Sequence, residues 1–84
     1  MSTVSYYETL RGEIVSLLKQ ERKRRKLSNY TVSQRCGVSE SMLSRLERGQ
    51  CNPSLETTLR IADGIGVDLA SIVKKARAAV GRSG

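Results

Sequence analysis

The chain of 84 residues is long enough for one small domain, and its 15 Lys and Arg against 8 Asp and Glu give a formal net charge of +7. With no His and only two Cys, the composition offers neither a metal-binding cluster nor a base for nucleophilic catalysis, so we expect no enzyme, no metal and no cofactor. No apolar run approaches the roughly 18 residues of a membrane span, and no signal-peptide pattern is present. We therefore expect a soluble, cytoplasmic protein whose basic charge suits a polyanionic partner.

Helical spacing of the apolar residues predicts an all-α chain of five helices. The first helix is expected from about Ser5 to Lys26, and Gly12 lies inside it. Residues 1–13 form an N-terminal extension together with the start of this helix. The helix ends in a run of five basic residues, 22–26, whose exposed members either reach a DNA backbone or simply face solvent.

The next two predicted helices begin with the same sequence pattern. In each, a Ser can cap the helix start with its hydroxyl, and the apolar residue before the cap can pack against one at the fourth helical position. Gly37 separates the two helices, at a point where a positive φ is usually needed. The residues that carry the pattern are Leu27, Ser28 and Val32 for the second helix and Val38, Ser39 and Leu43 for the third.

Two further helices complete the predicted domain, which we place at residues 14–80. Ser54 is expected to cap the fourth helix and Gly66 to end it, and Asp68 is expected to cap the fifth. The apolar faces are expected to consist of Leu55, Leu59, Ala62 and Ile65 in the fourth helix and of Leu69, Ile72, Val73, Ala76 and Val80 in the fifth. We expect residues 81–84 to form a disordered tail.

Residues 29–48 meet the steric demands of a helix-turn-helix. Two short helices that cross steeply need a small residue at the crossing, which Ser33 supplies, and a turn residue such as Gly37. Apolar residues fill the inward positions, which are Val32, Cys36, Val38, Leu43 and Leu46. An ordinary helical hairpin explains the apolar spacing, but it does not explain the joint match with the two small residues and the basic charge.

Here the chain resembles the phage-repressor/Cro type of helix-turn-helix, often called the XRE family. The resemblance covers about residues 14–75, and its most specific part is GVSESMLSRLERG, residues 37–49. It implies a compact five-helix, lambda-repressor-like domain and sequence-specific binding to a DNA operator. The sequence departs from the family pattern at three positions, which are Asn29 in place of Gln, Ser33 in place of Ala and Gly64 in place of Ala. The last change lowers helix stability by about 1 kcal/mol on propensity alone.

The third helix is expected to lie in the DNA major groove, which is wide enough to admit an α-helix. Leu43 and Leu46 must point inward, so the positions around them face outward. Glu40 could accept from a cytosine amino group or simply favour the helix start, Arg45 could bind a guanine edge, and Met42 could touch a thymine methyl group. The predicted base-reading residues are Met42 and, by the resemblance, Ser39, Glu40, Ser41 and Arg45.

Residues on either side of the third helix are expected to contact the DNA backbone. The second helix begins with free backbone N–H groups, and the resemblance matches two residues after the third helix to backbone contacts. The predicted backbone contacts are Ser28, Asn29, Tyr30, Arg48 and Asn52. The resemblance also pairs Arg22 with Glu47, which implies an ion pair within the domain rather than a DNA contact.

We expect a homodimer that binds a palindromic operator on double-stranded DNA, because one recognition helix covers only a few base pairs. The predicted dimer interface consists of Ile65, Val67, Leu69, Ile72 and Val73. No small-molecule ligand is expected. The alternative is a protein-interaction module, such as an antitoxin or an adaptor that binds another regulator. Restriction–modification controller, phage regulator and antitoxin all stay open, as does the sign of regulation.

Overall fold

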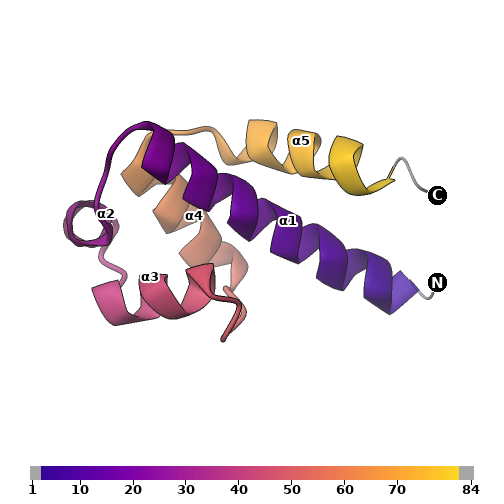
Figure 1. Ribbon diagram of the computed structural model, residues 1–84, viewed down its shortest axis with the longest axis horizontal. Coiled ribbons are helices and arrows are strands. Elements are labelled where there is room, and N and C mark those ends of the chain that lie inside the picture. Colours follow the sequence, from indigo (N-terminus) through magenta and orange to yellow (C-terminus); the bar gives the residue numbers. More distant parts are fainter. Residues whose placement is uncertain (1–2, 82–84) are drawn as a thin grey trace.

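The computed structural model describes residues 3–81, and this part of the chain folds into five α-helices without a strand (Figure 1). The helices are α1 (Thr3–Arg24), α2 (Asn29–Cys36), α3 (Glu40–Glu47), α4 (Leu55–Ile65) and α5 (Leu69–Gly81). The predicted all-α fold is confirmed. The first helix starts and ends two residues earlier than expected. The last helix includes Gly81, and the rest of the expected tail, residues 82–84, lies outside the described residues.

Three serines begin the inner helices as predicted. Their hydroxyl oxygens accept hydrogen bonds from the backbone N–H three residues further on, at 3.0 Å for Ser28, 3.1 Å for Ser39 and 3.1 Å for Ser54. Gly37 and Gly66 follow α2 and α4 with φ of 77° and 93°. This is the left-handed region that glycine adopts without a side-chain clash. The caps therefore set the lengths of the short helices and the tight turn between α2 and α3.

The first helix ends in a left-handed turn that contains no glycine. Lys26 has a φ of 58°, and the N–H of Leu27 donates to the carbonyl of Arg22 at 3.0 Å. This bond reaches back five residues, as in the Schellman motif that closes many helices. A left-handed residue with a side chain costs about 1 kcal/mol more than glycine there. The turn directs the chain into α2 and leaves the Lys26 side chain exposed.

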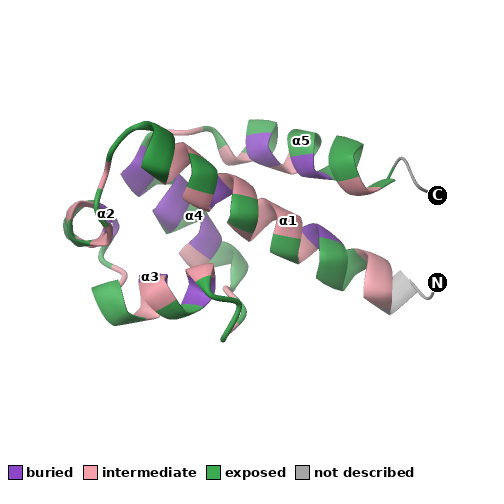
Figure 2. Ribbon diagram, viewed as in Figure 1, coloured by how far each residue is buried: buried purple, intermediate pink, exposed green. Residues whose placement is uncertain are grey.

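The hydrophobic core lies where α1, α4 and α5 meet the α2–α3 unit. Val32 has no exposed surface, and Leu43 and Leu46 of α3 are buried beside it, as the helix-turn-helix pattern predicts. Figure 2 shows exposed residues at the start of α3 and buried residues on the inner sides of α4 and α5. The core residues are Leu18, Val32, Cys36, Leu43, Leu46, Ile61, Ala62, Ile65 and Ile72.

The buried face of α4 differs from the predicted one. Leu55 is 72% exposed and Leu59 is 44% exposed, although both were expected to face the core. The inward positions of this helix are Thr58, Ile61, Ala62 and Ile65, which recur at helical spacing. Thr58 can be buried because its hydroxyl donates to the carbonyl of Ser54 at 2.7 Å. The expected stripe is therefore wrong at its first two members.

A two-helix arm projects from the rest of the domain. The first half of α1 runs alongside α5, and both helices extend to the same end of the molecule (Figure 1). Leu10 and Ala76 are buried between them. We define the arm as residues 5–15 of α1 together with α5. None of the helices in residues 3–81 combines the length and the apolar composition that a bilayer span requires.

Candidate nucleic-acid interface

One arginine fixes the position of α3 against α1. The guanidinium of Arg22 donates from Nε to Oε2 of Glu47 at 2.7 Å and from Nη2 to Oε1 at 2.9 Å. Its Nη1 donates to the carbonyl of Leu27 at 2.7 Å. The two side chains are only 13% and 16% exposed. The resemblance paired these residues, and the structure brings them together in a partly buried, bidentate contact that also holds the turn before α2.

The first helix of the α2–α3 unit, α2, is held against α4 by a close approach. A Cβ atom built on Gly64 would lie 3.0 Å from the Cβ of Cys36 and 3.3 Å from the backbone oxygen of Val32. Two arginines reach across the same contact: Arg35 donates to the carbonyl of Gly64 at 3.3 Å, and Arg60 donates to the carbonyl of Cys36 at 3.4 Å. The pattern of the helix-turn-helix alone did not point to Gly64, which lies outside it.

The outward side of α3 presents polar and charged groups to solvent. Glu40, Ser41 and Arg45 are exposed, and Arg48 follows as the exposed cap residue. Because Leu43 and Leu46 are buried on the opposite side, these groups are not needed for the core. The hydroxyl of Ser39 is occupied by the helix cap. Three of the five predicted base-reading residues, Glu40, Ser41 and Arg45, therefore lie on one exposed surface, and Ser39 lies at its edge.

Met42 does not face outward with the other predicted base readers. It is half-buried, packs against the core and lies with its Sδ 3.5 Å from Sγ of Cys51. The reason is the loop between α3 and α4, which folds back over this side of α3. Met42 is thus a packing residue, and we withdraw it from the base-reading set. Asn52, in the same loop, is exposed as expected.

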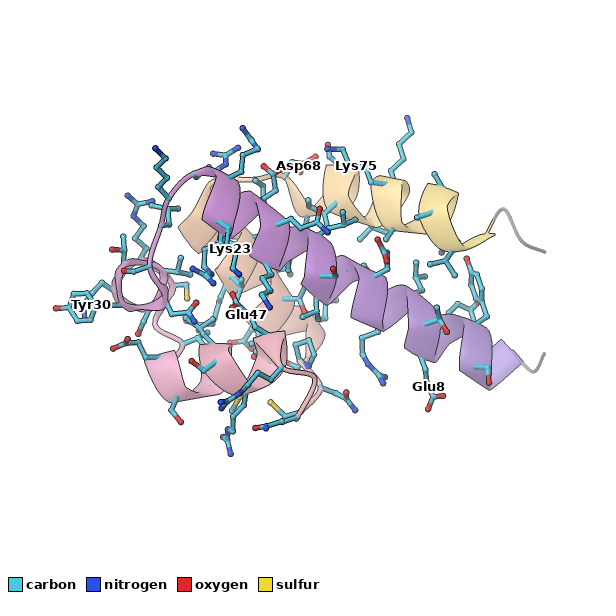
Figure 3. All side chains as sticks on the ribbon, viewed as in Figure 1. Glu8, Lys23, Tyr30, Glu47, Asp68 and Lys75 are labelled. Atoms are coloured by element: carbon cyan, nitrogen blue, oxygen red, sulfur yellow. The ribbon has the colours of Figure 1, made fainter. Side chains whose placement is uncertain are left out.

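The start of α2 is only partly available for contact with a phosphate. The Oδ1 atom of Asn29 is buried and has no hydrogen-bond partner in the described residues, so this oxygen points into the protein. The hydroxyl of Ser28 is engaged in capping the helix. Tyr30 is 58% exposed and projects away from the body of the domain (Figure 3). Of the three predicted contacts in α2 and its cap, Tyr30 is exposed and is not used in capping the helix.

Apart from Arg22, which pairs with Glu47, the basic run at the end of α1 divides into two groups. Glu21 binds Arg24 at 2.7 Å and Arg25 at 3.5 Å, and the guanidinium of Arg25 lies beside Gly66. The hydrogen bond from Arg24 lowers the pKa of Glu21 and raises the pKa of Arg24. Lys23 and Lys26 are exposed, and Lys23 lies on the side of α1 that faces α2 and α3 (Figure 3). Among the described residues, the lysines of the run therefore take part in no ion pair, unlike its arginines.

Two of the five residues predicted for a dimer interface are buried within the domain. Ile65 and Ile72 are each only 3% exposed, because they fill the core between α4, α5 and α1. A second chain cannot pack on them without opening the fold. Val67, Leu69 and Val73 are half-buried and retain surface at the domain's edge. The predicted interface is therefore corrected to exclude the two isoleucines.

Comparison with known proteins identifies relatives that share this unit. The model of the helix-turn-helix family matches residues 18–72. The chain is 36% identical over 56 residues to the immunity repressor protein of Bacillus phage phi105, covering 67% of this chain and 39% of that protein. It is 31% identical over 72 residues to the HTH-type transcriptional regulator SutR of Escherichia coli strain K12, covering 86% of this chain and 40% of that protein.

A third relative comes from Haemophilus influenzae and is described as an uncharacterized HTH-type transcriptional regulator. It is 32% identical over 63 residues, covering 75% of this chain and 64% of that protein. The chain spans about two fifths of the length of the first two relatives and just under two thirds of the third. The similarity therefore covers only a part of each of these proteins.

Proposed function

The chain belongs to the helix-turn-helix family, and on that premise we propose that it is a transcriptional regulator that binds a specific palindromic DNA operator as a homodimer. Its target is double-stranded DNA, read in the major groove by α3. We propose Arg45 as the principal base-reading residue, with Glu40 and Ser41 beside it.

The observation that carries this proposal is the chemistry of the outer side of α3. Glu40, Ser41 and Arg45 are exposed together, while the pair between Arg22 and Glu47 holds the helix rigidly against α1. A fixed helix with hydrogen-bonding side chains on its free side is what readout of base edges requires. An arginine fork can bind O6 and N7 of guanine together, which no other base offers at that edge.

Contacts to the phosphates would flank this helix and orient it. Arg48 and Asn52 follow α3, Tyr30 lies at the start of α2, and Lys23 and Lys26 lie at the end of α1. Such contacts supply affinity without carrying sequence information. A domain with a net charge of +7 should therefore bind any DNA weakly and its operator more tightly.

Selection of binding sites from random double-stranded DNA tests the proposal directly. We expect enrichment of an inverted repeat whose half-sites are centred about one helical turn, roughly 34 Å, apart. Two chains should be bound per selected site, as measured by sedimentation of the complex. Failure to enrich any sequence over random DNA would refute sequence-specific readout. Enrichment of a single half-site bound by one chain would refute the palindrome and the dimer.

A further inference from the structure

The ends of α2 and α4 each receive an arginine from the other helix. Nη1 of Arg60 in α4 donates to the carbonyl of Cys36, the last residue of α2, at 3.4 Å. Nη1 of Arg35 in α2 donates to the carbonyl of Gly64, the next-to-last residue of α4, at 3.3 Å. The last carbonyls of a helix have no donor within that helix, and they carry its partial negative charge. Each arginine therefore supplies a donor and a positive charge to the end of the other helix.

Glu56 holds the guanidinium of Arg60 from the opposite side. Both residues belong to α4 and lie one turn apart, and Nε and Nη2 of Arg60 are each 3.0 Å from the same carboxylate oxygen, Oε2. These two contacts leave Nη1 for the carbonyl of Cys36. Because a guanidinium is planar and rigid, a carboxylate that holds two of its nitrogens also sets the direction of the third. The ammonium of a lysine cannot be oriented in this way.

The guanidinium of Arg60 lies at the turn between α2 and α3. Its Nη1 is 3.5 Å from the position that a Cβ atom on Gly37 would occupy. Gly37 ends α2 with a φ of 77°, and its N–H donates to the carbonyl of Ser33 at 2.9 Å. The cap of α3, Ser39, follows two residues later. Arg60 therefore makes its contact where the chain turns from α2 into the recognition helix.

The stability of the domain does not explain this arrangement. The side chains of Arg60 and Glu56 are 54% and 75% exposed, and exposed ion pairs contribute little to the free energy of unfolding. The arrangement does bear on the position of the α2–α3 unit. Arg22 holds the end of α3 and the turn before α2, whereas Arg60 holds the turn between the two helices. The unit is thus fixed by side-chain hydrogen bonds at separate points.

We propose that Arg60 is a positioning residue for DNA recognition, which sets the angle of the α2–α3 unit against α4 without contacting DNA itself. The inference rests on the proposed function. Readout of a base edge requires α3 to lie correctly in the groove while the flanking residues bind phosphates. A small rotation of the unit therefore weakens operator binding more than binding to random DNA, which depends mainly on charge. Arg35 supports the same contact from α2, and Glu56 orients the guanidinium.

The test replaces arginine by lysine, which keeps the positive charge and removes the planar fork. Arg60→Lys is compared with Arg77→Lys, the same change at an exposed arginine of α5. Glu56→Gln is the second variant, because it keeps the length of the side chain and removes the carboxylate that orients Arg60. Circular dichroism verifies that each full-length variant is folded. Fluorescence anisotropy at one salt concentration gives the Kd for the operator selected by the native chain and the Kd for random DNA.

We expect Arg60→Lys to raise the operator Kd about three- to tenfold and to leave the Kd for random DNA within about twofold of the native value. Glu56→Gln should lower the ratio of operator affinity to random-DNA affinity in the same direction, and Arg77→Lys should leave that ratio unchanged. An Arg60→Lys variant with the native operator Kd would overturn the proposal. So would an equal loss on operator and random DNA, which would assign Arg60 a general role in the fold.

Amide hydrogen exchange without DNA separates this inference from the proposed function. The N–H of Gly37 bonds to the carbonyl of Ser33 beside the Arg60 contact. We expect this N–H to exchange at least about threefold faster in Arg60→Lys than in the native chain or in Arg77→Lys. Unchanged exchange would overturn the inference whatever the DNA measurements give. A native chain without any sequence preference would refute the proposed function, and exchange alone would then decide whether Arg60 holds the turn.

Discussion

Arg22 and Glu47 join the first and third helices through two parallel hydrogen bonds of 2.7 Å and 2.9 Å. The third N–H group used by Arg22 holds the carbonyl of Leu27, so one side chain connects α1, the turn before α2 and the end of α3. A planar guanidinium can make these three contacts at once, whereas an ammonium cannot. The position of α3 therefore depends on a residue that lies outside the proposed DNA-reading surface.

Removing either partner should destabilise the whole domain. We expect Arg22→Ala to lower the free energy of unfolding by about 3–5 kcal/mol, because it leaves the Glu47 carboxylate partly buried without its partner. The double variant Arg22→Met with Glu47→Leu should recover much of that loss, since no charge is left unpaired. Urea denaturation of the single and double variants measures both effects. A cost for Arg22→Ala below about 1 kcal/mol would mean that the pair behaves like an exposed one.

Two glycines in helices should respond to alanine in opposite directions. Alanine favours a helix over glycine by about 1 kcal/mol. Gly12→Ala should realise this gain, because a Cβ there meets nothing within 4 Å. Gly64→Ala should instead destabilise the domain, because its Cβ would press against Cys36 and the backbone of Val32. Thermal unfolding of the two variants provides the comparison, and a rise in Tm for Gly64→Ala would show that α2 can move away without cost.

Helix positions and caps could be predicted from the sequence because they depend on near neighbours. Ser28, Ser39 and Ser54 each cap a helix through bonds to residues three positions away. The buried face of α4 could not be predicted as safely, because its apolar residues form one broad arc and only the part with Ile61, Ala62 and Ile65 is buried. Thr58 looks polar in the sequence, yet its hydroxyl is satisfied within its own helix and the residue is buried in place of Leu55.

Which side chains of the candidate site face solvent could not be predicted fully either, because this depends on contacts between residues far apart in the sequence. Met42 turns inward because the loop after α3 brings Cys51 against it. Glu21 selects two members of the basic run as intramolecular partners, and nothing in the spacing of residues 22–26 distinguishes those two from the lysines. The family resemblance correctly paired Arg22 with Glu47, which lie 25 residues apart. The helical spacing of apolar residues did not indicate this pair.

The two groups within the basic run should differ in their effect on DNA binding. Replacing Lys23 by Ala and Lys26 by Gly should flatten the plot of log K against log salt, by about 0.9 for each phosphate that the protein no longer neutralises. Glycine suits the left-handed backbone at position 26, so the fold should not suffer. The control is the double variant Arg24→Ala with Arg25→Ala. It removes the same amount of positive charge, but from arginines that pair with Glu21. Equal flattening in both double variants would contradict a specific role for the lysines.

The proposed base contact of Arg45 is tested by site selection from random DNA with the native chain, Arg45→Ala and Arg48→Ala. Both arginines are exposed, so neither change should disturb the core. We predict that Arg45→Ala costs about 1–3 kcal/mol on the operator and relaxes the preference at one base pair in each half-site. Arg48→Ala should weaken all sequences alike and leave the selected site unchanged. If Arg45→Ala also lowers affinity equally on every sequence and selects the native site, Arg45 contacts a phosphate and does not read a base.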